Sequence, residues 1–227
     1  MDIPPASQQA LHKINGFSST QAILLTYLVA KKALAVPGCF VECGVANGGG
    51  SAPMAVALSE VGDPRTLHLF DSFQGLPFCG PHDKGQIGYE PGNYLMDPNL
   101  PLEERLKPTN IAGGPIEAVE FNFKSWGVGP ANVEFHKGWF QHTLPGIKLA
   151  PIAFLRLDGD LYESTMCCLE NLYGQVAPGG YVWLDEWGMP DGIGGKQAFF
   201  DFFAARNEPV PTMLELADTG AGYWKIL

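Results

Sequence analysis

Short apolar runs alternate with segments of helical spacing along most of the chain. The runs lie at 39–41, 66–70, 133–136, 152–157 and 181–184. Between them, apolar positions recur at helical spacing at about 51–60, 102–106, 116–126, 163–176 and 195–206, and an earlier helix capped by Ser18 or Ser19 extends to Leu34. Buried parallel strands are short continuous apolar runs, and helices cross over between them. The pattern therefore predicts an α/β fold with a doubly wound, mostly parallel sheet.

The last part of the chain departs from this alternation. Two strands are expected at about 212–216 and 223–227, joined by the turn Asp218-Thr219-Gly220. Two such segments joined by a short turn with glycine are typical of a hairpin. We therefore expect an antiparallel hairpin at the C-terminal edge of the sheet.

The segment 72–100 has no clean period. It is rich in Gly, Pro and Asn and contains Tyr89 and Tyr94. A loop of this length inside a compact domain is typical of a lid or binding loop. No repeat or low-complexity linker divides the chain. We therefore expect one domain over 1–227, with an N-terminal helical segment at 1–36 and a lid or acceptor loop at 72–100.

Composition excludes several classes of protein. The 227 residues are 46% apolar and 17% charged, which favours a folded domain over a disordered one. The formal net charge of −10, without a Lys/Arg-rich run, argues against nucleic acid or an anionic membrane as partner. The longest apolar run, 22–30, is shorter than the roughly 20 residues that span a bilayer. No basic start followed by an apolar stretch marks a secretory signal.

The five cysteines include no C-x-x-C pair, which argues against a cysteine zinc site or a redox motif. We interpret them as small buried apolar residues in a reducing compartment. The predicted location is the cytoplasm. A homo-oligomer stays open as a possibility.

Four of the expected strands end in an acidic residue, namely Glu42, Asp71, Asp158 and Asp185. In a doubly wound sheet, ligands bind at the carboxyl ends of the strands, near the point where the strand order reverses. A single acid at such a place is often a helix cap or a loop residue. Four together indicate a ligand site.

A glycine-rich turn, 44–50, follows the first strand. Its glycines let the backbone approach a ligand closely, and the helix after it offers free N–H groups. The spacing is not that of a dinucleotide fingerprint, because the next glycine after Gly44 is Gly48. The acid before the turn, Glu42, suits a cationic amino group better than a pyrophosphate. A plain tight turn would explain the glycines but not the acid.

Asp71 ends the next strand, where a carboxylate can accept hydrogen bonds from the hydroxyls of a ribose. Glu42 and Asp71 together describe a ligand with an amino-acid end and a nucleoside end. S-adenosylmethionine has that shape. The candidate cofactor-binding residues on these two turns are Glu42, Gly44, Val45, Gly48, Ser51, Asp71 and Ser72.

Asp158 and Asp185 converge if the fourth and fifth strands are neighbours. Two like charges so close repel each other unless a cation joins them. The candidate ligands are all oxygen donors, which favours Mg²⁺, or Mn²⁺ or Ca²⁺, over zinc. Alternatively, Asp160 and Glu163 cap the helix that follows, and Asp185-Glu186 is a solvated loop. That alternative leaves Asp158 and Asp185 unexplained.

The histidines are less informative. His12 and His68 are interpreted as surface or packing residues. His136 and His142 flank Gly138-Trp139-Phe140, beyond the third strand and near the same edge of the sheet, so either is a candidate for contact with substrate. His142 is the candidate catalytic residue of the two.

Longer motifs indicate a family. They are VECGV at 41–45 with Gly48-Gly49, FDSFQGLP at 70–77, KGWF at 137–140 with TLP at 143–145, and RLDGDLYEST at 156–165. On these motifs, from about residue 38 to the end, the chain resembles the macrocin O-methyltransferases. These are class I S-adenosylmethionine-dependent enzymes that methylate sugar hydroxyls in antibiotic biosynthesis.

The resemblance implies a seven-stranded methyltransferase sheet, a bound divalent cation, usually Mg²⁺, and cofactor contacts at Glu42, Gly44 and Asp71. It also implies that Asp158 is both a metal ligand and the base. Asp185 and Glu186 complete the metal site. The family often has Asp-Asp at this last position, and glutamate is one methylene longer.

These observations predict an S-adenosylmethionine-dependent O-methyltransferase, assisted by a divalent metal, that acts on a hydroxyl of a small molecule. A sugar of a glycosylated natural product is the expected acceptor, and a catechol-type phenol is the alternative. Three other classes are weaker alternatives: a nucleotide-dependent oxidoreductase, a metal-dependent hydrolase, and a binding protein that keeps the pocket without catalysis.

Overall fold

The computed structural model describes residues 2–83, 97–129, 131–188, 194–215 and 219–227. Within these ranges one sheet has seven strands in the order β3-β2-β1-β4-β5-β7-β6. The strands are β1 (Cys39–Cys43), β2 (Thr66–Asp71), β3 (Asn132–Lys137), β4 (Ile152–Leu157), β5 (Val176–Leu184), β6 (Leu214–Glu215) and β7 (Gly222–Lys225). β1 to β5 are parallel, and β7 is antiparallel to both β5 and β6. The predicted doubly wound sheet with an antiparallel C-terminal hairpin is confirmed.

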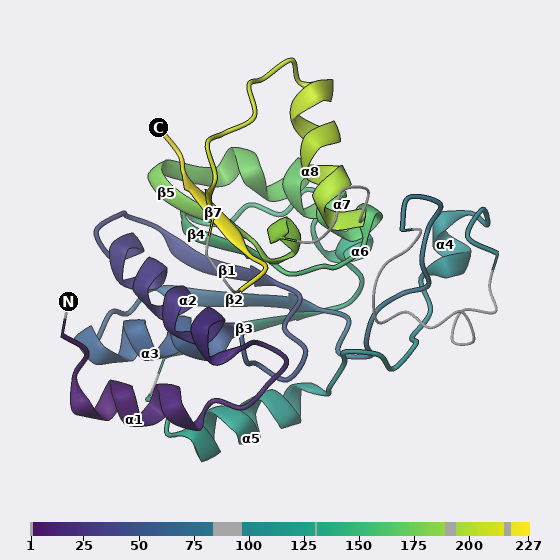
Figure 1. The fold of residues 1–227 in the computed structure, drawn as a ribbon. Helices are drawn as coiled ribbons and strands as arrows, with labels where there is room; N and C mark the ends of the chain where they lie inside the picture. The colour runs from purple at the N-terminus through teal and green to yellow at the C-terminus, as the bar shows by residue number, and fades with distance from the viewer. Residues whose placement is uncertain (1, 84–96, 130, 189–193, 216–218) are drawn as a thin grey trace.

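Helices cover both faces of the sheet (Figure 1). On one face lie α1 (Pro5–Lys13), α2 (Thr20–Ala33), α3 (Ser51–Val61) and α5 (Ile116–Trp126). On the other lie α6 (Phe140–Thr143), α7 (Tyr162–Leu172) and α8 (Gly194–Ala205). The short α4 (Leu102–Arg105) lies beyond the carboxyl ends of the central strands (Figure 1). Among the described residues, no helix is long and apolar enough to cross a membrane.

Alternating side chains along each strand build two separate apolar cores. Phe40 and Phe154 pack under α2 and α3, whereas their neighbours Val41 and Leu155 pack under α7 and α8. Burial on both faces explains why the central strands are continuous apolar runs. It also makes the charged residues within these strands, Glu42 and Arg156, exceptional, since both are fully buried.

Most element boundaries agree with the expectation, including the Ser19 cap, whose hydroxyl accepts a hydrogen bond from Ala22 N at 3.1 Å. The expected helix over 163–176 was too long. It ends at Leu172, and β5 begins at Val176 and continues through Pro178-Gly179-Gly180. The reason is tertiary, because Gly179 N donates to Ile226 O and Ile226 N donates to Gly180 O, both at 2.8 Å. Pairing with the end of the chain extends the strand where local sequence indicates a break.

Candidate functional site

The pocket lies where the strand order reverses, between β1 and β4. After β1 the chain turns at Gly44 and leads to β2, and after β4 it turns at Asp158 and leads to β5, so the two connections run toward opposite edges of the sheet. The pocket has a volume of about 380 Å³, which is within the range of small-molecule sites. Its lining includes Phe17, Ser18, Gly44, Ala46, Asp71, Ser72, Trp139, Phe140, Gln141, Asp158, Asp160 and Asp185.

The glycine turn after β1 is shaped by close packing. Gly44 has φ +92°, and a Cβ there would lie 1.7 Å from the carbonyl oxygen of Asp158. A Cβ on Gly50 would lie 2.3 Å from Glu42 Oε1. Only glycine allows the turn to lie against the end of β4 and against the buried acid. The turn and the Asp158 backbone therefore form one rigid wall of the site.

Asp71 holds this turn in place. Its Oδ2 accepts hydrogen bonds from Val45 N at 2.7 Å and Ala46 N at 3.1 Å, and its Oδ1 accepts one from Phe73 N at 2.6 Å. Burial nevertheless raises the pKa of this carboxyl above its ordinary value. Asp71 also lines the pocket. It therefore organises two pocket loops and faces the ligand space as well.

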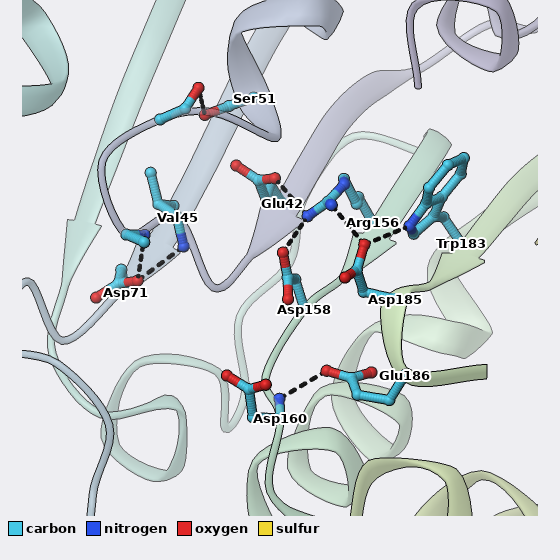
Figure 2. Close-up of polar contacts among 12 residues, drawn as sticks. Glu42, Val45, Ser51, Asp71, Arg156, Asp158, Asp160, Trp183, Asp185 and Glu186 are labelled. Atoms are coloured by element: carbon cyan, nitrogen blue, oxygen red, sulfur yellow. Dashed lines mark hydrogen bonds and ion pairs between the residues drawn. The ribbon is translucent and has the colours of Figure 1, made fainter. Parts of the chain in front are cut away.

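Arg156 is a buried cation of the candidate site that sequence reasoning missed. It points from β4 into the space between three carboxylates (Figure 2). Nη1 lies 3.0 Å from Glu42 Oε1 and 2.6 Å from Asp158 Oδ2, and Nη2 lies 2.6 Å from Asp185 Oδ1. The signal was available, because a charged residue inside an apolar strand requires buried partners of opposite charge.

Burial is the largest influence on the pKa values of Arg156 and Glu42. Burial opposes the charge of Arg156, but Asp158, Asp185 and Glu42 raise its pKa, so it stays a cation. Burial raises the pKa of Glu42 to about 8 against the attraction of Arg156. Trp183 packs its ring 5.7 Å from the guanidinium and donates its Nε1–H to Asp185 at 3.1 Å. The charges and the ring hold Asp158 and Asp185 at fixed positions on the pocket wall.

A second group of carboxylates lies beside the first. Oxygens of Asp158, Asp160 and Glu186 lie within 4.8 Å of one another. Glu186 Oε1 accepts a hydrogen bond from Asp160 N at 2.7 Å, and Asp160 has φ +59°, a conformation uncommon outside glycine. Burial is the largest cause that raises the pKa values of Asp160 and Glu186 well above the ordinary range, and the neighbouring acids add to it. Burial, together with the negative charge of Asp185, raises the pKa of Asp158 to about 6.

These residues fit a hard divalent cation. Glu186 Oε2 is buried and has no hydrogen-bond partner among the residues that the structure describes. A buried unpartnered carboxylate oxygen is costly unless a cation satisfies it. The three side chains offer only oxygen donors, which suits Mg²⁺ or a similar ion.

The predicted metal ligands fall into two groups in the structure. Asp158 and Glu186 belong to the oxygen cluster, and Asp160 joins them there. Asp185 lines the same pocket but is bound to Arg156. The assignment of Asp185 as a ligand stays a prediction.

The predicted cofactor-binding residues form two groups. Gly44, Asp71 and Ser72 line the pocket, whereas Glu42, Val45, Gly48 and Ser51 are not among its lining residues. The cation beside Glu42 is Arg156, and within the described ranges of the chain Glu42 Oε2 has no hydrogen-bond partner. The roles predicted for these residues toward a cofactor stay predictions.

His142 lies on α6, next to the pocket-lining residues of that helix. Its side chain is 51% exposed, and Nε2 lies 3.1 Å from Glu103 Oε2. It is not among the residues that line the pocket. This placement favours a carboxylate over His142 as the base.

Segment 72–100 contributes Ser72, Leu76 and Pro77 to the pocket. Arg105, after the segment, is buried, donates to the carbonyl oxygen of Leu100 at 3.1 Å and pairs with Glu163 at 2.7 Å. Tyr89 and Tyr94 lie outside the described residues. The lid function of the segment stays a prediction.

Loss of Arg156 is expected to destabilise the fold. Arg156→Met leaves Glu42 buried without its cation, and removing one partner of a buried ion pair costs about 3–5 kcal/mol in the free energy of unfolding. Urea denaturation measures this loss. The double variant Arg156→Met/Glu42→Gln should lose less than the sum of the two single changes. Arg206→Met, which removes an exposed arginine paired with Glu208, is the control and should change little. Equal losses in Arg156→Met and the control would contradict this account.

Comparisons with known proteins agree with this architecture. The family model described as macrocin O-methyltransferase (TylF) matches residues 25–226. The O-methyltransferase NovP has a solved structure with a TM-score of 0.72 and 31% identity, covering 92% of this chain and 80% of that one.

Two curated relatives come from Streptomyces. The 8-demethyl-8-(2,3-dimethoxy-alpha-L-rhamnosyl)-tetracenomycin-C 4'-O-methyltransferase of Streptomyces olivaceus is 38% identical over 155 residues, 68% of this chain and 54% of that protein. The demethyldecarbamoylnovobiocin O-methyltransferase of Streptomyces niveus is 38% identical over 172 residues, 73% and 60% of the two chains. This chain thus spans between half and two thirds of the length of these relatives. The match over residues 25–226 shows that the chain belongs to the macrocin O-methyltransferase family.

Proposed function

We propose that this protein transfers the methyl group of S-adenosylmethionine to a hydroxyl of a small molecule, with the help of Mg²⁺ or a similar cation. The observation that carries the proposal is the pocket at the reversal of strand order, which Gly44 and Asp71 line together with Asp158 and Asp160, two members of the oxygen cluster that Glu186 completes. Gly44 and Asp71 suit a nucleoside with an amino-acid end, and the oxygen cluster suits a hard cation.

The proposed roles follow from these positions. Asp158, Asp160 and Glu186 would hold the cation, and Asp185 is the further candidate ligand. When bound, the cation supplies positive charge that lowers the pKa of the acceptor hydroxyl. S-adenosylmethionine supplies a methyl group on a positively charged sulfur.

The chain's own residues would then orient the acceptor hydroxyl and remove its proton. The rigid wall made by Gly44 and the end of β4 fixes the distance between the two halves of the pocket, which is what alignment of an attacking oxygen requires. Asp158 faces the pocket, and Arg156 Nη1 holds its Oδ2 at 2.6 Å. We assign to Asp158 the removal of the hydroxyl proton.

The acceptor class is proposed from the relatives. One of them is named as a methyltransferase of a rhamnosyl-tetracenomycin, so a sugar of a glycosylated natural product is the proposed acceptor. Phe17 and Ser18, between α1 and α2, line the pocket together with Trp139, and Phe17 is otherwise 75% exposed. We propose that Phe17 and Trp139 contact the apolar part of such a molecule.

Methyl transfer is tested with labelled S-adenosylmethionine and a panel of acceptors. The panel contains glycosylated natural products with free sugar hydroxyls, free sugars and catechols, each with and without Mg²⁺. Label in a sugar ether supports the proposal, and label only in catechols favours the phenolic alternative. No transfer to any acceptor, together with tight cofactor binding, would favour a binding protein. Binding of NAD in place of S-adenosylmethionine would favour an oxidoreductase.

Replacing Asp71 with Ala is expected to weaken S-adenosylmethionine binding at least tenfold. The change removes a carboxylate that faces the pocket and supports two of its loops, and each charge-assisted hydrogen bond is worth roughly 1.5–3 kcal/mol. Calorimetry with S-adenosylmethionine measures the affinity. Asp201→Ala, on α8 and outside the pocket lining, is the control. An Asp71→Ala protein that is folded and binds as tightly as the parent would contradict the assignment.

A further inference from the structure

We infer that His68, Glu134 and His136 form a second metal site, for a divalent transition ion of the Zn²⁺ class, on the outer strand of the sheet. β2 contributes His68, and β3 contributes Glu134 and His136. Glu134 and His136 are two positions apart on one strand, and His68 pairs in register with Glu134, so all three share one face. None of them lines the pocket, and the inference does not depend on the proposed function.

The distances match those of a metal's ligands. His68 Nδ1 lies 3.0 Å from His136 Nε2 and 3.5 Å from Glu134 Oε2, and His136 Nε2 lies 3.7 Å from Glu134 Oε1. Ligand atoms about 2.0–2.1 Å from a tetrahedral Zn²⁺ are about 3.3–3.4 Å apart. The three separations lie on both sides of this value. A single ion can therefore contact all three side chains with only small movements.

The rings are already oriented. The His136 ring stacks on Phe70, with centroids 4.0 Å apart and planes 6° apart, and this stacking directs Nε2 toward His68. A hydrogen bond between the His68 and His136 rings uses one proton and accounts only for the 3.0 Å separation of their nitrogens. It does not explain why Glu134 places one oxygen near each ring. Coordination uses both ring nitrogens and the carboxylate, with each imidazole proton on the other nitrogen.

Burial and donor type select the ion. The side chains of His68 and His136 are 10% and 18% exposed, whereas that of Glu134 is 58% exposed. Two ligands are thus held by the fold, and the outer side stays open for water as a fourth ligand. Imidazole nitrogen selects Zn²⁺ and similar ions over Mg²⁺ and Ca²⁺. β3 is the last strand at this edge of the described sheet (Figure 1), so the ion would tie it to β2.

Metal-stripped protein titrated with Zn²⁺ in excess Mg²⁺ tests the inference, because Mg²⁺ occupies oxygen sites and leaves nitrogen sites available. We expect one Zn²⁺ per chain and a rise in Tm of about 5–10 °C at a free Zn²⁺ concentration about 100 times Kd. Co²⁺ in place of Zn²⁺ should give the intense visible absorption of a four-coordinate ion. The protein with Asp158→Asn, altered in the other cluster, should behave in the same way.

The variants His136→Gln and Glu134→Gln separate this site from others. Loss of an outer-shell partner costs about 10–100-fold in metal affinity, so loss of a direct ligand should cost at least that much. Glu134 is largely exposed, so Glu134→Gln should fold even if His136→Gln does not. Glu120→Gln, an exposed position on α5, is the matched control. The inference is overturned if Zn²⁺ does not bind, or if both variants bind it as tightly as the parent with an unchanged Co²⁺ spectrum.

Discussion

In the Asp158→Asn protein, turnover is expected to fall by about 10²–10⁴-fold even at saturating Mg²⁺, the range typical for loss of a general base. Asparagine keeps the shape and can still accept the hydrogen bond from Arg156 Nη1, so the wall of the pocket should stay in place. What is lost is the negative charge and the ability to take a proton. Metal affinity should also fall, because a carboxylate ligand becomes a neutral amide.

S-adenosylmethionine affinity should change little in this variant, because Gly44 follows β1 and Asp71 ends β2, whereas Asp158 follows β4. Steady-state kinetics and calorimetry on the same preparation measure both quantities. His142→Ala, the comparison variant, should keep turnover within a few-fold, since His142 does not line the pocket. If Asp158→Asn also stays within a few-fold, Asp158 is not the base and Asp160→Asn is the next variant to measure. A collapse of cofactor affinity would show that the two halves of the pocket are not separate.

Removal of divalent cations with EDTA is expected to abolish methyl transfer, and Mg²⁺ or Mn²⁺ should restore it. The reason is the concentration of negative charge. Asp158, Asp160, Asp185 and Glu186 lie together, and Arg156, the cation among them, already pairs with Glu42 as well. Without a further cation the carboxylates repel one another, and this repulsion adds to burial, the larger cause, in raising the pKa values of Asp158 and Asp160. Full turnover in a metal-stripped sample would refute the metal requirement.

The proposed role of Glu186 as a ligand of the cation has a test of its own. Glu186 Oε2 has no hydrogen-bond partner in the part of the chain that the structure describes, whereas its Oε1 accepts a hydrogen bond from Asp160 N. Glu186→Gln should therefore weaken Mg²⁺ binding by at least tenfold. Loss of a residue that only supports a ligand already costs about 10–100-fold in metal affinity, and loss of a direct ligand should cost at least as much. The exposed Glu103→Gln is the control, and calorimetric titration with Mg²⁺ compares the two. An unchanged affinity in Glu186→Gln would make Glu186 a structural residue that supports Asp160.

The amino-acid sequence by itself determines the order of strands and helices, the edge of the sheet that carries the candidate site, and the family. Apolar runs and helical spacing predict the order of strands and helices because these patterns reflect burial of one or both faces, which is a local property. The acids at the ends of the strands predict a site at the carboxyl edge for the same reason, since strand direction follows from the alternation of elements. The long motif at 156–165 indicates the family, which the match over 25–226 confirms.

Only the tertiary structure decides which acids meet. The sequence predicts that Asp158 and Asp185 converge, and in the fold the guanidinium of Arg156 binds both of them, while Asp160 lies with Asp158 and Glu186 in the oxygen cluster. His68 and His136 are 68 positions apart and come together only because β2 and β3 pair in one register. The extension of β5 likewise depends on hydrogen bonds to Ile226. Each of these depends on strand order and register, which bring distant positions within a few ångströms, and no local pattern along the chain encodes those contacts.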